Sequence, residues 1–231
     1  MMRRLTVVLC AALSIAANFT SASAGEPAAI EAEAGACARL TAPDGVQLDA
    51  VPEWVTSPSL PKYCRVRGIA AAHVHFEMRL PERWNGRFMM AGCGGFCGEL
   101  LPDKPGHSNA INEALKRGYA AIAHDGGHQA KSWETDWSSD PEVLELWAHR
   151  VLPVVARAGI AMTVSLYGRP PHHKYYSGCS NGGRLGLMAA QRYPELFDGI
   201  AAGGSIFDLS GDARADRRRD LSTGLARRRP L

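Results

Sequence analysis

The stretch "HHKYYSGCSNGGRLGLMAAQRYPELFDGIAAGG", His172 to Gly204, decides the fold. Within it, Lys174–Gly178 has the composition of a short buried strand, and Gly182–Tyr193 has the apolar spacing of an amphipathic helix. A second apolar run, Gly199–Gly204, predicts another strand. A strand, a helix and a strand in this order are typical of neighbouring parallel strands joined by a crossover helix.

The five residues between the first strand and the helix, Gly178 to Gly182, form a G-x-S-x-G pattern centred on Ser180. In this setting the serine occupies a sharp, strained turn, and small residues on both sides relieve clashes with the neighbouring backbone. The N–H groups at the start of the helix point toward the same place and stabilise a developing oxyanion. The pattern predicts Ser180 as a nucleophile. The alternative is an ordinary surface serine in a glycine-rich turn.

The segments before this stretch alternate between strand and helix patterns. Strands are expected at His73–Leu80, Arg87–Ala91 and Tyr119–Asp125, and helices at Asn109–Gly118 and from Asp140-Pro141 to Gly168, kinked or divided at Pro153. Such alternation predicts an α/β fold with a mostly parallel sheet that carries helices on both faces.

The N-terminus has the features of a secretory signal peptide over residues 1–24. Two arginines precede the apolar run Leu5–Ala17, which is too short to span a bilayer, and Ala22-Ser23-Ala24 fits a cleavage site. We expect a mature, soluble chain from Gly25 in the periplasm or outside the cell, since no other apolar run approaches membrane length. An uncleaved anchor is the alternative.

The net charge of +3 over 231 residues does not indicate a nucleic-acid-binding protein. Residues 25–206 hold 17 basic and 19 acidic side chains, and the excess of arginines lies in the signal segment and the last 25 residues. A nucleic-acid groove requires clustered Lys and Arg on one face. We expect neither a nucleic-acid partner nor a membrane partner after signal removal, and the sequence sets no oligomeric state.

Five cysteines remain after signal removal, so at least one lacks a partner within the chain. Cys37 and Cys64 are expected to pair, because export permits disulfides and the loop is long enough to restrict the unfolded chain. Cys93 and Cys97 either pair or stay reduced. Cys179 is the expected leftover. No second Cys/His pair at ligand spacing follows, so zinc is not expected.

Several segments resemble the tannase and feruloyl esterase family. The stretch from Tyr175 to Gly203 is similar to the family's nucleophile region, in which a cysteine directly precedes the serine. "RLPERWNGRFMMAGCGGFCG" (79–98), "GYAAIAHDGGH" (118–128), "ACARL" and "YCRVRGIAA" resemble its upstream segments in the same order. The resemblance covers about Cys37 to Gly204.

The resemblance implies an α/β-hydrolase and assigns roles to individual residues. Ser180 would accept the acyl group, and the backbone N–H groups of Asn181 and Gly95 would stabilise the oxyanion. The implied reaction is hydrolysis of aromatic acid esters, such as hydroxycinnamates and gallates, through an acyl-enzyme. Family members link the cysteine before the serine to a cysteine that follows the catalytic histidine. No such partner for Cys179 exists here, in agreement with the odd count.

Other parts of the family pattern are missing. In an α/β-hydrolase the triad acid and histidine follow the serine in the chain, but all eight histidines precede Ser180 (His73, His75, His107, His124, His128, His149, His172 and His173). The family's lid and its calcium site have no counterpart, so no cofactor is expected. We expect residues 25–206 to form a partial core and residues 207–231 a divergent, disordered Arg/Asp-rich tail, from truncation or a frameshift rather than a short natural variant.

These absences leave three functions open. The first is an exported serine esterase of this family with low activity, because loss of triad members costs on the order of 10⁴ to 10⁶ in turnover. The second is an inactive remnant that at most binds an aryl ester or a partner. The third is a related esterase that acts on other aryl, thioester or polyester-derived esters.

Other residues have competing interpretations. His124 and His128 have an H-x₃-H spacing, but the two intervening glycines favour a loop that forms the floor beside Ser180 over a metal site. His172 and His173 indicate a solvated turn, with a substitute base as the alternative. Arg184 could form a structural ion pair or orient substrate. Trp84 is expected beneath a turn, and three tryptophans are assigned to the core or a pocket wall (Trp133, Trp137 and Trp147).

Overall fold

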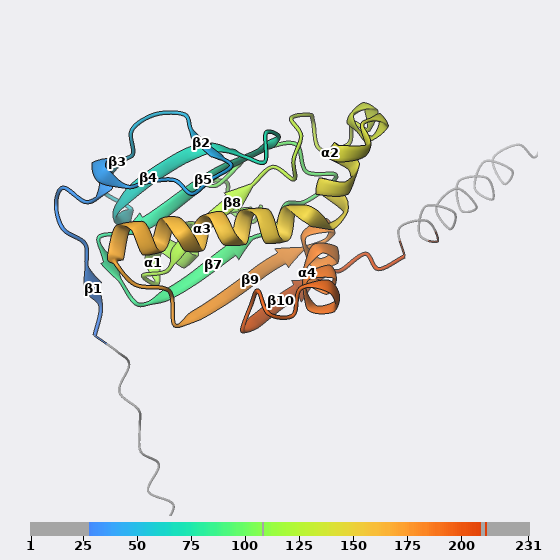
Figure 1. The fold of residues 1–231 in the computed structure, drawn as a ribbon. Helices are drawn as coiled ribbons and strands as arrows, with labels where there is room; N and C mark the ends of the chain where they lie inside the picture. The colour runs from blue at the N-terminus through green and yellow to red at the C-terminus, as the bar shows by residue number, and fades with distance from the viewer. Residues whose placement is uncertain (1–27, 108, 209–210, 212–231) are drawn as a thin grey trace, which may run out of the picture.

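The computed structural model describes residues 28–107, 109–208 and 211 (Figure 1). The strands are β1 (Ile30–Glu31), β2 (Val46–Leu48), β3 (Glu53–Ser57), β4 (Leu60–Ala70), β5 (Val74–Pro81), β6 (Arg83–Trp84), β7 (Arg87–Ala91), β8 (Ala120–His124), β9 (His173–Cys179) and β10 (Gly199–Gly203). The helices are α1 (Asn112–Lys116), α2 (Pro141–Glu145), α3 (Val151–Tyr167) and α4 (Asn181–Arg192), with 3₁₀ turns η1 (Cys37–Arg39) and η2 (Asp136–Ser139) and a π-helical turn η3 (Leu146–Arg150). The expected signal peptide and nearly all of the expected tail lie outside the described residues.

The main sheet has the strand order β10-β9-β7-β8-β5-β4-β2 within the described residues, and β3 also pairs with β4. Strands β8, β7, β9 and β10 are parallel. Strands β5, β4, β3 and β2 are joined by antiparallel pairing, and β5 pairs antiparallel with β8. The expected parallel sheet is therefore confirmed only for the half that contains Ser180, because hairpin connections build the other half.

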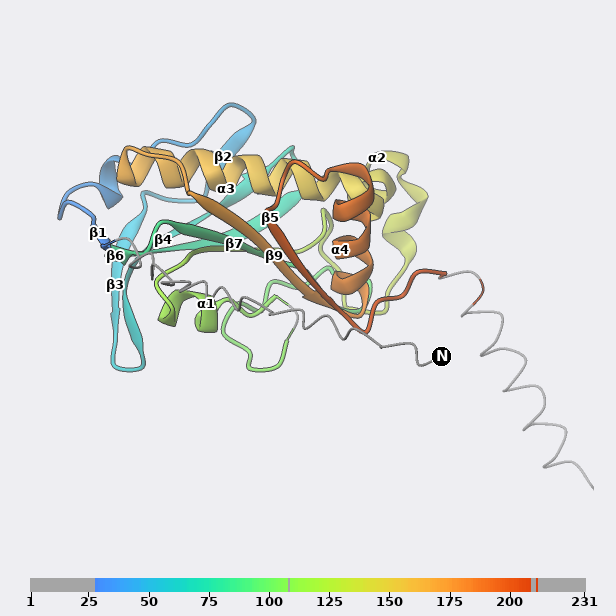
Figure 2. The same ribbon diagram turned by 90° about the horizontal axis from the view of Figure 1, so that it is seen from below.

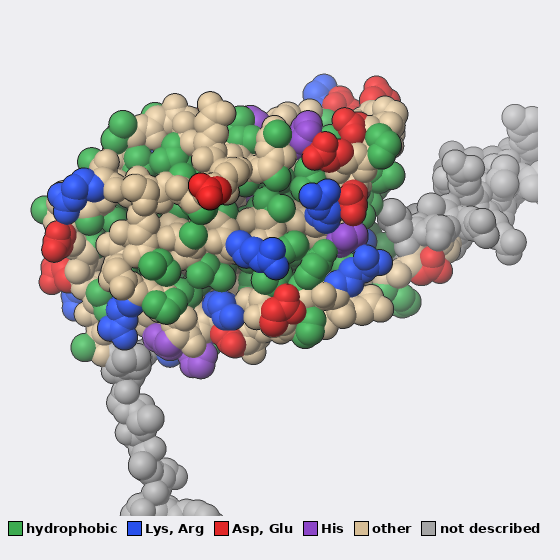
Figure 3. All heavy atoms as spheres, in the orientation of Figure 1, with side chains coloured by type: hydrophobic (Ala, Val, Ile, Leu, Met, Phe, Trp, Pro, Cys, Tyr) green, Lys and Arg blue, Asp and Glu red, His purple; other side chains and the backbone are tan. Residues whose placement is uncertain are grey.

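Helices cover both faces of this sheet, as expected for the α/β class. Figure 2 shows α3 and α4 on one side and the short α1 on the other. Phe88 of β7 packs against Gly159 of α3, and Tyr176 of β9 packs against Gly186 of α4. On the opposite face, Ile111 and Ala114 beside and within α1 pack with alanines of β7 and β8. Figure 3 shows the α3 side, where basic, acidic and hydrophobic side chains are interspersed.

The long helical region begins where the sequence predicts but is divided differently. Asp140 caps α2 by accepting hydrogen bonds from the N–H groups of Glu142 and Val143 at 2.9 and 3.4 Å. Pro153 lies in the first turn of α3 without breaking it, and the irregularity is the π-helical turn η3 just before it. Since proline has no N–H to donate, the preceding turn adjusts instead.

The region from Pro141 to Tyr167 is long and apolar enough to cross a membrane by length and composition alone. The sequence-based statement that no second apolar run approaches that length is therefore wrong. Half of the region's most apolar 18-residue window is buried within the fold, and Val155 and Met162 of α3 are fully buried in the main core. Its apolar character is thus explained by packing on the sheet.

The antiparallel half was not predicted as strands before His73. Strand β4 carries a period-two pattern in which buried Val66, Gly68 and Ala70 alternate with more accessible positions, which is a strand signal. The disulfide between Cys37 and Cys64 is present, with 5.6 Å between the Cα atoms, so the expected pairing is confirmed. It ties the segment before β2 to the middle of β4.

Candidate active site

The turn predicted at Ser180 is present between β9 and α4. Ser180 has φ 58° and ψ −119°, a backbone conformation that side-chain-bearing residues rarely adopt and that costs about 1–3 kcal/mol. Its N–H donates to the Gly203 carbonyl at 2.9 Å, and its own carbonyl accepts from the N–H of Arg184 at 2.9 Å. Hydrogen bonds to β10 and α4 therefore hold the strained residue on both sides.

The glycines of the motif are required by close backbone contacts. A Cβ on Gly178 would lie 2.5 Å from the Gly182 carbonyl oxygen, and a Cβ on Gly182 would lie 3.3 Å from the Cys93 carbonyl oxygen. The buried Tyr176 hydroxyl donates to the Gly182 carbonyl at 2.7 Å, and burial raises the pKa of this tyrosine. The turn is therefore held by contacts with β9 and with the loop after β7.

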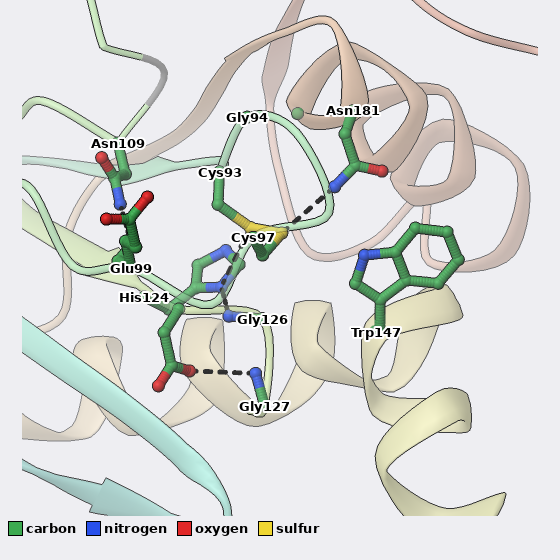
Figure 4. The surroundings of a disulfide bond; sticks show 12 residues. Cys93, Gly94, Cys97, Glu99, Asn109, His124, Gly126, Gly127, Trp147 and Asn181 are labelled. Carbon is green, nitrogen blue, oxygen red and sulfur yellow. Dashed lines mark hydrogen bonds between the residues drawn. A yellow bond between two sulfur atoms is a disulfide. The ribbon is translucent and has the colours of Figure 1, made fainter. Parts of the chain in front are cut away.

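The glycine-rich loop after β7 lies directly against the start of α4. The Gly92 N–H donates to the Ser177 carbonyl at 2.9 Å. Cys93 and Cys97 form a disulfide, which the sequence left undecided. The Asn181 side-chain amide donates to Cys97 Sγ at 3.1 Å, and Figure 4 shows this contact between the loop and the residue after Ser180.

Gly95, the second expected oxyanion donor, lies inside the loop closed by this disulfide. It has φ 60°, and a Cβ there would lie 2.1 Å from Ser132 Oγ. The N–H of the next residue, Phe96, donates to the Ser132 carbonyl at 2.7 Å. The structure thus places Gly95 in a fixed loop beside the turn, while its role as a donor stays a prediction.

His124 ends β8, and residues 125–128 form a loop next to it, as the two glycines predict. Figure 4 shows His124, Gly126 and Gly127 close to the disulfide. His124 Nδ1 accepts from the Gly126 N–H at 3.1 Å and lies 4.0 Å from Cys93 Sγ. Burial lowers the pKa values of His124 and His128 to about 4 and raises that of Asp125 to about 6. His128 stacks on Trp137 at 3.9 Å. No group of three potential metal ligands occurs among the described residues.

An aromatic cluster surrounds this loop. Phe96 contacts both Trp133 and Trp147 edge-on, and Trp137 lies 5.5 Å from Trp147 between ring centroids. Trp133 is 75% exposed, Trp137 is partly buried and Trp147 is buried. The expected core position is therefore confirmed for Trp147, and a role as pocket wall stays a prediction. Trp84, in contrast, is fully buried, and its indole N–H donates to the Arg87 carbonyl at 2.8 Å across the predicted turn.

Arg184 has a role that the sequence did not reveal. It forms no ion pair with a carboxylate among the described residues, so the expected structural ion pair is wrong. Its guanidinium donates to the Trp147 and Ala148 carbonyls at 3.0 and 2.8 Å and to Asn181 Oδ1 at 2.7 Å. The two carbonyls come from residues 36 and 37 positions earlier, so no local sequence signal indicates this arrangement.

The remaining candidates lie away from the Ser180 hydroxyl or make other contacts. No described residue forms a hydrogen bond with that hydroxyl. His149 Nδ1 is 2.7 Å from the Tyr193 hydroxyl, and His173 Nδ1 is 4.0 Å from Asp198. Both His172 and His173 are exposed. His172 lies in the expected solvated turn, whereas His173 is the first residue of β9.

Cys179 is exposed and takes part in neither disulfide. It lines an open hollow of about 590 Å³ on the α1 side of β9 and β10, together with His107 and Ala110.

Comparison with known proteins places this site in a family. The chain is 35% identical over 178 residues to the mono(2-hydroxyethyl) terephthalate hydrolase of Piscinibacter sakaiensis, covering 70% of this chain and 30% of that protein. It is 37% identical over 134 residues to a probable feruloyl esterase of Arthroderma benhamiae, covering 54% and 23% of the two chains. Each alignment thus spans less than a third of the relative's length.

A solved structure gives the same result. Feruloyl esterase B from Aspergillus oryzae superposes with a TM-score of 0.62 at 25% identity, covering 74% of this chain and 37% of the other. The family model for tannase and feruloyl esterase matches residues 59–216, a range that begins after Cys37 and ends inside the segment expected to diverge. On these matches, the chain belongs to the tannase and feruloyl esterase family.

Proposed function

We propose that this chain carries the nucleophile and oxyanion donors of an exported serine carboxylic ester hydrolase acting on small aromatic acid esters. One observation carries the proposal: Ser180 has a strained backbone, φ 58° and ψ −119°, between a parallel strand and the helix α4. That geometry lifts the serine out of the strand and aims it at the helix N-terminus.

In the proposed reaction, Ser180 Oγ forms a bond to the ester carbonyl carbon, and the carbonyl oxygen takes up negative charge. The backbone N–H groups of Asn181 and Gly95 donate to that oxygen. The bond to the alcohol then breaks, and the alcohol leaves with the serine proton. Water then bonds to the acyl carbon, the bond to Ser180 Oγ breaks, one proton of the water returns to Ser180 Oγ, and the acid is released. Donors fixed in advance at the oxyanion contribute roughly 3–4 kcal/mol each to such reactions.

A second candidate function is binding of an aryl ester without turnover. It is favoured by the Ser180 hydroxyl, which has no hydrogen-bond partner among the described residues. A serine without a base is a weak nucleophile. The two candidates therefore differ in the reactivity of one hydroxyl.

A fluorophosphonate probe distinguishes them. The purified chain is treated with the probe, and modification is located by peptide mass spectrometry. Selective labelling of Ser180 that is lost in Ser180→Ala supports the esterase. Ser177→Ala, three residues earlier in β9, is the matched control and is expected to label normally. Labelling no faster than that of the other serines supports binding without turnover.

The substrate class is tested with a panel of esters. Methyl ferulate and methyl gallate represent the proposed aromatic acid esters, and a terephthalate monoester represents the relative named for that activity. Hydrolysis above the Ser180→Ala background for one class identifies the acyl group preferred. Hydrolysis of aliphatic esters alone contradicts the aromatic assignment.

Export is part of the same proposal. The two disulfides support an oxidising compartment, together with the predicted signal peptide. Periplasmic or medium fractions of the expressing cell are expected to contain a chain beginning at Gly25, which N-terminal sequencing detects. A chain that retains residues 1–24 and stays in the cytoplasm contradicts this part.

A further inference from the structure

Arg184 is a half-buried cation with no carboxylate partner among the described residues. Burial lowers the pKa of its guanidinium to about 10, so it stays charged at neutral pH. Removing a charge from water is unfavourable unless hydrogen bonds compensate. The contacts that compensate this charge therefore indicate what the residue does.

Two of these contacts anchor the guanidinium to the helical turn η3. Its two terminal nitrogens donate to the Ala148 and Trp147 carbonyls at 2.8 and 3.0 Å, and the group lies 4.2 Å from the Trp147 ring centroid. Both acceptor residues lie in η3, the turn directly before α3. Arg184 is thus fixed to a rigid part of the core.

The third contact reaches the residue after the serine. Arg184 Nε donates to Asn181 Oδ1 at 2.7 Å, and the amide group of the same Asn181 side chain donates to Cys97 Sγ at 3.1 Å. Asn181 is only 3% exposed. Figure 4 shows its amide directed at the disulfide. The Asn181 side chain is therefore held at both ends, by α4 on one side and by the glycine-rich loop on the other.

We propose that Arg184 is a positioning residue that holds the Asn181 backbone N–H in the direction of the oxyanion. It does so through the Asn181 side chain and does not itself touch the ester. The inference rests on the proposed function of Ser180. It also explains why a cation in this place bonds to an amide and two carbonyls: a carboxylate would compete with Asn181 for Nε.

The test uses Arg184→Met and Arg184→Lys in the full chain. Lysine keeps the charge but cannot reproduce the three-way fork of the guanidinium. The maximal rate of Ser180 phosphonylation is expected to fall about 10- to 100-fold in both variants, with little change in the probe concentration at half-maximal rate. Arg192→Met, an exposed cation at the end of α4, is the control with an unchanged rate.

A second measurement reads the position of Asn181 without any reaction. The ¹⁵N order parameter of its backbone amide is expected to fall from about 0.85 toward 0.6 in both Arg184 variants, with no change in Arg192→Met. The proposal is overturned if the Arg184 variants change only the probe concentration at half-maximal rate and not the maximal rate. It is also overturned if the order parameter of Asn181 is unchanged in folded Arg184→Lys.

These outcomes separate the two proposals. If the unaltered chain does not label, the proposed function fails, and the order parameter alone decides the role of Arg184. If the chain labels and both variants label at the same maximal rate, the positioning role fails while the esterase proposal stands. Circular dichroism identifies a variant that is unfolded. In that case the other variant, with its fold intact, gives the decision.

Discussion

The antiparallel half of the sheet and the parallel half use charged groups differently. In the antiparallel half, Glu77 and Arg79 of β5 are both 1% exposed and pair at 2.6 Å, and Arg79 continues to Asp103 at 2.8 Å. In the parallel half, Arg184 is held by an amide and two carbonyls, with no described carboxylate. The first half neutralises its buried charges, whereas the second leaves a cation beside the proposed nucleophile.

The backbone also differs between the two halves: it is regularly paired in the antiparallel half and strained at Ser180 in the parallel half. Strands β4 and β5 pair over eight consecutive positions from Tyr63–Pro81 to Ala70–Val74. Around Ser180, in contrast, the chain is strained, and glycines allow backbone segments to touch. The comparison suggests that the antiparallel half supplies stability on which the strained turn depends. Strain at functional sites persists only where the surrounding structure over-determines it.

The largest effect is expected for Arg79→Met. The substitution leaves Glu77 buried with only the half-exposed Arg67 as a partner, and loss of one member of a buried ion pair costs about 3–5 kcal/mol. The free energy of unfolding, measured by urea titration, should fall by that amount. Lys116→Met, which removes an exposed pair with Glu113, is the control and should leave it nearly unchanged, because water screens exposed pairs. Equal losses would contradict the assignment.

Removal of each of the two disulfides is the next test of the difference between the two halves. Cys37 and Cys64 are 27 residues apart in sequence, and Cys93 and Cys97 are four apart. By loop entropy, the double alanine variants should lose about 3.5 and about 2 kcal/mol respectively. Only the second variant should slow Ser180 labelling beyond its loss of folded protein, because only that disulfide contacts Asn181. Labelling slowed by the first variant alone would reverse the roles of the two halves.

How much of the structure can be predicted from the sequence depends on how far apart in the sequence the interacting residues lie. The turn at Ser180 follows from neighbours within two positions, and the strands β5, β7, β8, β9 and β10 follow from local apolar patterns, so these were predictable. The antiparallel pairing of β5 with β8 was not, because register between strands about 45 residues apart depends on tertiary packing.

The contacts within the candidate site show the same limit. Asn181 was assigned for its backbone N–H, but its side-chain contact with Cys97 spans 84 residues. Arg184 depends on carbonyls 36 and 37 residues earlier. Local patterns therefore located the serine, while the groups that hold its neighbour in place became visible only in three dimensions.

Acidification should weaken the region under the disulfide. His124 has a pKa of about 4 in the fold against 6.5 when unfolded, so between these values the unfolded chain binds more protons and stability falls as pH falls. At pH 5 this contributes a loss of about 2 kcal/mol. His128 acts in the same direction. Asp125, with a pKa raised to about 6, opposes both between about pH 6 and 4.

Urea titrations at pH 7 and pH 5 check this sign. The unaltered chain should be less stable at pH 5, because two histidines outweigh one carboxyl. Asp125→Asn removes the opposing contribution, so its loss between the two pH values should be steeper. A chain that is more stable at pH 5 would show that Asp125 dominates the loop.

The smallest effect is expected at the start of α2. Asp140→Ala removes the acceptor of the Glu142 and Val143 N–H groups, and loss of such a cap costs about 1 kcal/mol. Asp140→Asn retains a side-chain oxygen and should restore most of that stability, as thermal unfolding would show. Because α2 leads directly into η3, which carries the carbonyls bonded by Arg184, the alanine variant should also broaden the amide resonances of Trp147 and Ala148. A stability loss without any change at η3 would mean that the cap and the site are independent.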